Sequence, residues 1–281
     1  MQNLSGRSAF VTGGGSGIGR GIAIALAKEG MKVAIGDLDA DHAAQVADEL
    51  RASGAEAIAF AVDVTDEASL AQVAGAAESA LGAIRVLSNN AGVSLPQGCL
   101  SEKTQLDWDW AFSVNMFGIV KSVRAFLPQM RAAIAKEGGE AHIVNTASMA
   151  GLVTIPSIEV GVYGASKYAC TSYTEQLRAE LAGEGIGVSV LCPGLVDTPL
   201  SATSARNRPE KFGGAFAAGD GTLPEGLRAS AMHPEAVGPI VVRGIRANLL
   251  HIITHPESRF LVEARFAQIL ADYDAALGLG A

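Results

Sequence analysis

Short runs rich in apolar and β-branched residues alternate along the chain with longer, alanine-rich stretches. The short runs predict strands at residues 8–12, 32–36, 57–62, 84–88, 141–146, 188–191 and 252–254. The longer stretches predict helices at about 17–29, 106–135 and 162–182, the second of these with a bend at Pro128. They also predict a helix that ends at about 54, one that begins at 66 and one that follows Pro256. This alternation is typical of α/β proteins, so we expect a doubly wound, mostly parallel, seven-stranded sheet with helices on both faces.

A chain of 281 residues can form one large domain or two small ones. No internal repeat, low-complexity tract or linker divides it. One irregular stretch, at about 194–233, is rich in glycine, proline, serine and alanine, and a connection of this length inside a compact domain is more often functional than incidental. We therefore expect a single domain over residues 1–281 with a substrate lid at about 194–233.

The composition excludes several functional classes. Acidic residues outnumber basic ones, 29 to 21, and the formal net charge of −8 argues against nucleic acid as a partner. The three cysteines, Cys99, Cys170 and Cys192, are far apart and odd in number, which indicates reduced thiols rather than disulfides or a zinc site. Since neither a secretory leader nor a membrane-spanning apolar run is evident, we expect a cytoplasmic protein without a membrane partner.

A glycine-rich turn follows the first predicted strand and opens a helix, with the pattern T-G-x-x-x-G-x-G. A flexible surface loop is the alternative, but this context favours a turn whose backbone approaches a pyrophosphate at a helix N-terminus. Its predicted contacts are Gly13, Ser16, Gly17, Ile18 and Gly19. Asp37 ends the second strand, where a carboxylate binds the adenosine ribose and repels a 2′-phosphate. Because neither Ser16 nor Leu38 offers a cation there, we expect NAD rather than NADP.

Tyr163 and Lys167 are four residues apart, so a helix places them on one face. A nearby ammonium favours the phenolate form of tyrosine, which can take the proton of an alcohol. The same spacing occurs by chance on many amphipathic helices, so other motifs must support this interpretation. Ser148 follows the fifth predicted strand, where its hydroxyl can hydrogen-bond a substrate oxygen.

Taken in order, these motifs resemble the short-chain dehydrogenase/reductase family, in its compact branch with a Rossmann-type fold. The resemblance covers nearly the whole chain and rests also on Asp63-Val64, Asn89-Asn90-Ala91-Gly92, Asn115, Tyr163-Gly164-Ala165-Ser166-Lys167 and Pro193-Gly194. It implies that Asp63 and Val64 hold the adenine and that Asn90, Ala91 and Gly92 border the cofactor. It also implies that Pro193, Gly194, Val196 and Thr198 lie beside the nicotinamide.

The same resemblance implies a catalytic set. Tyr163 would be the acid/base, Ser148 would hold the substrate oxygen, and Asn115 would hold a water that links Lys167 to solvent. Lys167 would also bind the nicotinamide ribose. One departure stands out: the segment from Ser148 to Tyr163 is two residues longer than the family pattern, and the extra residues must bulge within 151–161.

The resemblance implies an NAD-dependent oxidoreductase that interconverts a secondary alcohol and its ketone. Apolar residues of the lid and the bulged segment suit a bulky, largely apolar substrate: Leu200, Phe212, Phe216, Leu223, Met232, Leu152, Val153, Ile155 and Ile158. The stretches 208–212 and 254–257 are similar to bacterial dehydrogenases that oxidise the benzylic alcohol of lignin-derived aryl ethers. The alternatives are a non-catalytic NAD-binding regulator and a ketoreductase that works mainly in the reductive direction.

Several further side chains need an interpretation. We expect no metal site, because His251 and His255 flank a predicted strand rather than sharing a helix face. Arg206, Arg208 and Lys211 could attract an anionic substrate, although such a cluster more often forms a solvated face. Trp108 and Trp110 suit packing or a subunit contact. Helices near 106–135 and 162–182 commonly pair between subunits in this family, so we expect a homodimer or homotetramer.

Overall fold

The computed structural model describes residues 1–154, 160–217 and 230–279. Its seven strands form one sheet in the order β3-β2-β1-β4-β5-β6-β7, and every neighbouring pair is parallel. The strands are β1 (Ser8–Thr12), β2 (Lys32–Asp37), β3 (Ala57–Ala61), β4 (Ile84–Asn89), β5 (Ala141–Thr146), β6 (Ile186–Cys192) and β7 (His251–Ile253). The predicted fold class is confirmed, and each predicted strand lies within two residues of its observed bounds.

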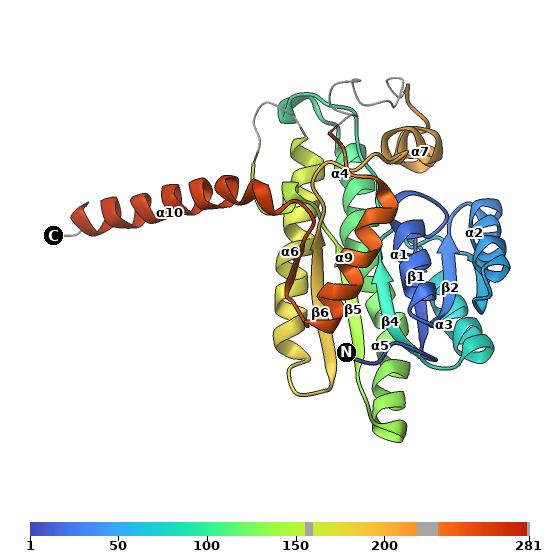
Figure 1. The fold of residues 1–281 in the computed structure, drawn as a ribbon. Helices are drawn as coiled ribbons and strands as arrows, with labels where there is room; N and C mark the ends of the chain where they lie inside the picture. The colour runs from blue at the N-terminus through green and yellow to red at the C-terminus, as the bar shows by residue number, and fades with distance from the viewer. Residues whose placement is uncertain (155–159, 218–229, 280–281) are drawn as a thin grey trace.

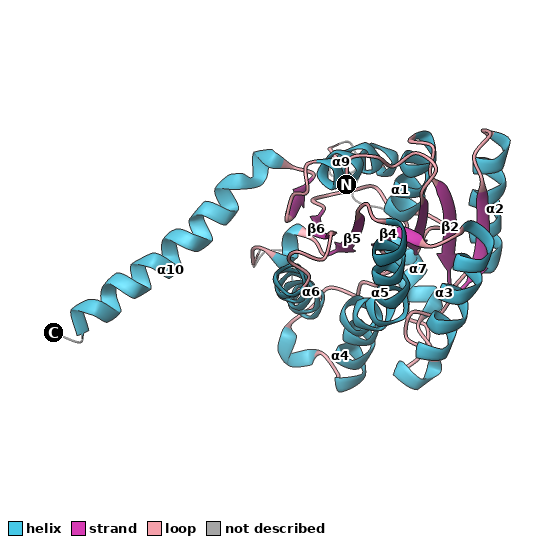
Figure 2. Cartoon of the chain, turned by 90° about the horizontal axis from the view of Figure 1, so that it is seen from below, coloured by secondary structure: helices cyan, strands magenta, loops and turns pink. Residues whose placement is uncertain are grey.

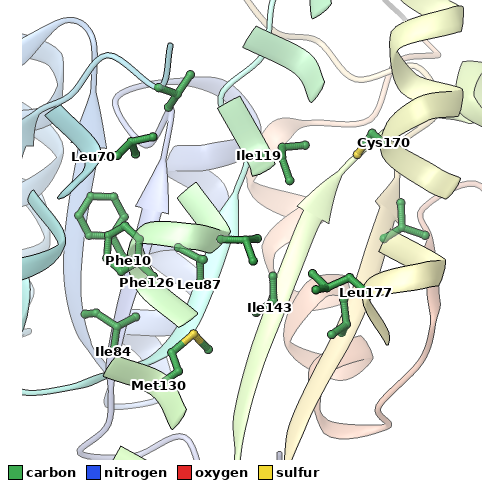
Figure 3. Close-up of a cluster of buried hydrophobic side chains, with 14 of the residues drawn as sticks. Phe10, Leu70, Ile84, Leu87, Ile119, Phe126, Met130, Ile143, Cys170 and Leu177 are labelled. Carbon is green, nitrogen blue, oxygen red and sulfur yellow. The ribbon is translucent and has the colours of Figure 1, made fainter. Parts of the chain in front are cut away.

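Helices cover both faces of this sheet (Figure 1, Figure 2). One face carries α3 (Glu67–Leu81), α4 (Gln105–Phe112), α5 (Gly118–Glu137) and α6 (Gly161–Glu180), and the other carries α1 (Gly17–Lys28), α2 (Ala40–Ala52) and α9 (Pro234–Arg246). Neighbouring β1 residues serve opposite faces. Phe10 packs on Phe126 of α5, with ring centroids 4.6 Å apart (Figure 3). Val11 belongs to the core cluster on the other face.

The predicted helix over 106–135 is wrong in one respect. The helical path runs through α4 and α5, but a π-helical segment, Ser113–Phe117, separates them. Such wide turns are rare and often occur at functional sites. This one contains Asn115, which is fully buried, so the widened turn directs an amide side chain into the protein.

Part of the predicted lid is described. It contains α7 (Leu200–Asn207) and a short 3₁₀ turn at Glu210–Phe212, whereas residues 218–229, including Leu223, lie outside the described part of the chain. The sequence favoured a solvated face for Arg208, but the structure buries this residue: its side chain is only 9% exposed. Its Nη1 donates to Asp107 Oδ1 of α4 at 2.7 Å, and its guanidinium lies over the rings of Trp110 and Phe216. These contacts attach the lid to α4.

The predicted closing helix is confirmed as α10 (Arg259–Leu279), which follows a 3₁₀ turn at Pro256–Ser258. It projects away from the rest of the molecule, and none of its residues is buried (Figure 1). No helix among the described residues is long and apolar enough to cross a membrane.

We expect the ion pair between Arg208 and Asp107 to stabilise the fold more than an exposed pair does. Burial alone would raise the pKa of Asp107, but hydrogen bonds from Thr104 and Arg208 outweigh it and hold that pKa below its usual value. The contribution is therefore present at neutral pH and is lost as the pH falls through this lowered pKa. A double-mutant cycle with Arg208→Met and Asp107→Asn, measured by urea unfolding at pH 7, should give a coupling of about 1.5–3 kcal/mol.

The matched control is Arg131 with Glu184, whose side chains are 50% and 34% exposed. The same cycle there should give about 0.2–1 kcal/mol, because solvent screens the pair. Equal coupling in the two pairs would contradict the buried role of Arg208.

Candidate active site

One cavity of about 990 Å³ lies at the carboxyl ends of the strands and collects most of the predicted site residues. Its lining includes Gly13, Ser16, Gly17, Ile18, Asp37, Leu38, Asp63, Val64, Asn90, Ala91, Gly92, Ser148, Tyr163, Lys167, Pro193, Gly194, Val196 and Thr198. Two predicted residues, Gly19 and Asn115, are buried behind this wall instead of lining it. In open α/β sheets, ligands bind at this edge, and the volume is at the upper end of the range for small-molecule sites.

The glycine turn after β1 is shaped by close backbone contacts. Gly13 has a φ of +62° and Gly17 a φ of +52°, a region that side-chain-bearing residues rarely adopt. A Cβ at Gly19 would lie 2.0 Å from the carbonyl oxygen of Gly13, so only glycine fits there. Gly19 is therefore needed for packing of the turn, and it does not line the cavity. The turn leads into the N-terminus of α1, which can bind an anion.

Asp37 is held in place at the end of β2. Its Oδ2 accepts the backbone N–H of Gly15 at 2.9 Å, and its Oδ1 accepts that of Asp39 at 3.0 Å. The same part of the cavity wall includes His42 and Arg206, which the sequence did not place there. His42 pairs with Asp39, with Nδ1 and Oδ2 3.0 Å apart, whereas Arg206 is exposed. The fixed carboxylate of Asp37 thus faces the cavity with basic side chains at its margin.

Tyr163 and Lys167 share one face of α6, as predicted. The Nζ of Lys167 lies 5.6 Å from the centroid of the Tyr163 ring. Lys167 is only 3% exposed, and its ammonium donates to the carbonyl oxygen of Thr146, at the end of β5, at 2.9 Å. Ser148 lines the same cavity, and its hydroxyl oxygen accepts the backbone N–H of Ala150 at 3.1 Å, which leaves the hydroxyl proton available for another acceptor.

Asn115 connects the π-helical segment to two neighbours. Its Oδ1 accepts the backbone N–H of Val93 at 2.8 Å, and its Nδ2 donates to the carbonyl oxygen of Val93 at 3.0 Å and to Ser166 Oγ at 2.9 Å. Ser166 in turn donates to the carbonyl oxygen of Tyr163 at 2.7 Å. The amide therefore fixes the loop after β4 against the helix that carries Tyr163 and Lys167.

Sequence reasoning missed several residues that support the site. The Oγ1 of Thr12 accepts the backbone N–H groups of Asn90 and Ala91 at 3.0 and 3.1 Å, which joins the ends of β1 and β4. Thr12 opens the glycine pattern and Ser166 lies inside the Tyr163–Lys167 motif, so their place in these motifs could have marked both as residues of the site. The carbonyl of Thr146 carried none, because a backbone group has no sequence signature.

The two histidines with helical spacing have other partners. His251 Nε2 lies 3.0 Å from Glu175 Oε1, whereas His255 Nδ1 accepts the backbone N–H of Gly194 at 3.2 Å. That contact supports the turn between Pro193 and Thr198. No cluster of three or more potential metal-binding side chains occurs among the residues that the structure describes.

The substrate side of the cavity differs in part from the predicted wall. Leu200 and Phe212 line it, and so do Leu95, Trp110, Val160 and Leu195. The cavity lining does not include Leu152, Val153, Phe216 or Met232, which pack instead against the two core clusters, and Ile155 and Ile158 lie outside the described residues. Trp110 is 2% exposed, which fits packing, one of the two roles that the sequence predicted for it.

Comparisons with known proteins agree with this architecture. The sequence profile of the family described as short chain dehydrogenase matches residues 7–209. A short chain dehydrogenase/reductase from Burkholderia phymatum, solved in complex with NAD, is 37% identical and superimposes with a TM-score of 0.88 over 97% of both chains. The apo form of LigO from Sphingobium sp. strain SYK-6 is 31% identical, with a TM-score of 0.80 over 98% of this chain and 92% of that one.

Among curated relatives, the C alpha-dehydrogenase of Sphingobium sp. strain SYK-6 is 31% identical over 274 residues, which cover 96% of this chain and 87% of the relative. A 1-deoxy-11-beta-hydroxypentalenate dehydrogenase from Streptomyces avermitilis is 40% identical over 201 residues, or 71% of this chain and 72% of the relative. Together with the profile match and the sheet order, these similarities show that the chain belongs to the short-chain dehydrogenase/reductase family and is an oxidoreductase of CH–OH groups.

Proposed function

We propose that the protein is an NAD-dependent dehydrogenase that interconverts a bulky, largely apolar secondary alcohol, such as an aryl alcohol, and its ketone. The observation that carries this proposal is the continuity of one cavity, whose wall extends from Asp37 past Gly13 and Lys167 to Tyr163 and Ser148. A dinucleotide and a second small molecule can therefore meet beside the phenol.

The cofactor end of the cavity fits a dinucleotide. The glycine turn allows the backbone to approach a pyrophosphate, and the carboxylate of Asp37 is positioned to accept the ribose hydroxyls. Asp63 and Val64 would hold the adenine, and Asn90, Pro193 and Thr198 would border the nicotinamide half. A nicotinamide bound there would supply the acceptor or donor of the hydride at the carbinol carbon.

The residues of the chain would handle the proton. Tyr163 takes the hydroxyl proton in the oxidative direction and returns it in the reductive direction. The ammonium of Lys167 stabilises the phenolate and donates to the ribose hydroxyls, while Thr146 fixes its position. Ser148 donates its free hydroxyl proton to the substrate oxygen, and Asn115 keeps the loop after β4 in register with α6.

The substrate end suits an aromatic, mostly apolar molecule. Its wall combines the ring of Trp110 with Leu95, Leu195 and Phe212. The C alpha-dehydrogenase aligns over nearly all of this chain, and residues 208–212 and 254–257 resemble benzylic alcohol dehydrogenases; both support an alcohol next to an aromatic ring. The segment 194–233 would act as the lid over this substrate within a single domain, attached to α4 through Arg208.

We expect Tyr163→Phe to lose turnover while it keeps cofactor binding, because the ring remains and only the ionisable oxygen is lost. General acid–base catalysis supplies about 10²–10⁴ in rate, so NADH formation from secondary benzylic alcohols should fall at least about a hundredfold. The control is Tyr173→Phe, on the same helix, where burial raises the pKa of the phenol to about 12. Near-native turnover by a folded, NAD-binding Tyr163→Phe variant would refute the mechanism.

We expect NAD to bind at least about tenfold more tightly than NADP, a difference of about 1.4 kcal/mol. The physical reason is repulsion between the fixed Asp37 carboxylate and a 2′-phosphate. Titration calorimetry of both cofactors should show Asp37→Ala narrowing this ratio, whereas Asp41→Ala, an exposed carboxylate in the first turn of α2, should leave it unchanged. If the wild-type protein binds NADP as well as NAD, Arg206 and His42 outweigh Asp37 and the assignment is wrong.

A further inference from the structure

The C-terminal helix α10 carries a row of large apolar side chains that the rest of the chain does not cover. It is 21 residues long and leaves the body beside α6 (Figure 1, Figure 2). The exposed side chains are Phe260 at 64%, Phe266 at 52%, Leu270 at 62%, Tyr273 at 68%, Leu277 at 76% and Leu279 at 89%. Four of them, Phe266, Leu270, Tyr273 and Leu277, share one side of the helix, and an exposed apolar row of this kind usually marks an interaction site.

The first two turns of α10 pack against the rest of the protein, and these contacts set the direction of the helix. Leu261 and Val262 pack against the core, and the guanidinium of Arg265 lies 5.2 Å from the centre of the Tyr168 ring on α6. Just before the helix, Ser258 Oγ donates to the carbonyl oxygen of His255 at 2.6 Å. After Arg265, every residue of α10 is exposed except Ile269, which is half-buried. The apolar row therefore belongs to the part that points into solvent.

The chemistry of this outer part favours a protein surface as its partner. Between Phe266 and Leu279 the only charged residues are Asp272 and Asp274. Helices that lie on membranes are rich in lysine and arginine on their polar face, and nucleic acids attract the same residues. Phe266, Leu270, Tyr273 and Leu277 follow the three- and four-residue spacing of one helix face, whereas Gln268, Ala271 and Ala275 lie on the opposite face.

We propose that α10 is an arm that docks on a second copy of this chain, and that the copy's own α10 docks reciprocally in a two-fold dimer. Every copy carries the arm, so the number of arms always equals the number of partners. A two-fold contact therefore covers the apolar rows of both copies at once. The exposed part of the helix, residues 266–279, is about 21 Å long and about 10 Å wide, so each arm can cover about 330 Å² on one side. Two arms and the surfaces they cover give about 1,300 Å², which lies within the range of specific protein interfaces.

The arm lies beyond the part of the chain that the family profile matches. Alignments that reach 97% and 98% of the chain leave fewer than about ten residues unmatched and so extend into α10, whereas the family profile ends at residue 209. The proposal does not rest on the proposed substrate or on the roles given to the active-site residues, because no residue of α10 lines the cavity.

Photo-crosslinking tests which molecule covers the arm. With p-benzoylphenylalanine in place of Tyr273, illumination of the purified full-length protein should give a covalent product of twice the 28.8 kDa chain mass. The same amino acid in place of Leu249, which is 48% exposed on the body, is the control and should give much less product. Adducts only within one chain, or capture of added phosphatidylcholine vesicles in place of a second chain, would overturn the proposal.

Charge substitutions test the same contact without a crosslinker. Leu270→Asp, Tyr273→Asp and Leu277→Asp, made together in the full-length chain, should raise the dissociation constant of the assembly at least about a hundredfold in analytical ultracentrifugation. These side chains are exposed within the protomer, so the charges should not destabilise its fold. At a concentration where the wild-type and variant proteins are both monomeric, their melting temperatures should be the same. The control variant, Gln268→Asp with Ala271→Asp and Ala275→Asp, places the same charges on the opposite face and should change the constant less than about tenfold. An unchanged assembly in the first variant would contradict the proposal.

Discussion

The site depends on a lysine ammonium buried where four segments of the chain meet. Lys167 on α6 is 3% exposed and donates to the carbonyl oxygen of Thr146 at the end of β5. A Cβ at Gly92 would lie 3.4 Å from its Nζ and 3.3 Å from Asn115 Oδ1, so the turn after β4 and the π-helical segment approach the same point. A buried charge is costly unless acceptors surround it, and this requirement fixes how closely these segments must pack.

The sheet below the site supplies this precision. Asn89 of β4 donates to Asn145 Oδ1 of β5 at 2.8 Å, and Asn145 donates to Thr174 Oγ1 of α6 at 3.1 Å. These buried amides connect two central strands to the helix that carries Tyr163 and Lys167, while Thr12 connects β1 to the turn after β4. Since buried polar groups need partners, this chain of hydrogen bonds selects one position for α6 relative to the sheet. The phenol and the ammonium are thereby placed at the cavity by the fold itself.

The sequence predicted the sheet, most helices and most of the cavity lining, because strand periodicity and the glycine, asparagine and tyrosine–lysine motifs are local patterns. It could not predict the π-helical segment around Asn115, because a turn widened by one residue leaves the apolar spacing of the flanking helices intact. Nor could it predict that Arg208 is buried against Asp107 and Trp110, since the residues of that contact are about a hundred positions apart. Gly19 illustrates a different limit: its pattern shows that a close backbone approach is needed, but it does not show that the carbonyl of Gly13 is the group approached.

In the proposed mechanism, the buried ammonium of Lys167 contacts both the cofactor and the phenol. Titration calorimetry of NAD with Lys167→Met tests it without any need to know the substrate. We expect NAD to bind this variant at least about tenfold more weakly than the wild-type protein, because an ammonium that donates to the ribose is gone. The control is Lys32→Met, which replaces a partly exposed lysine paired with Glu56 and should bind NAD normally. Wild-type affinity for NAD in a folded Lys167→Met variant would contradict the mechanism.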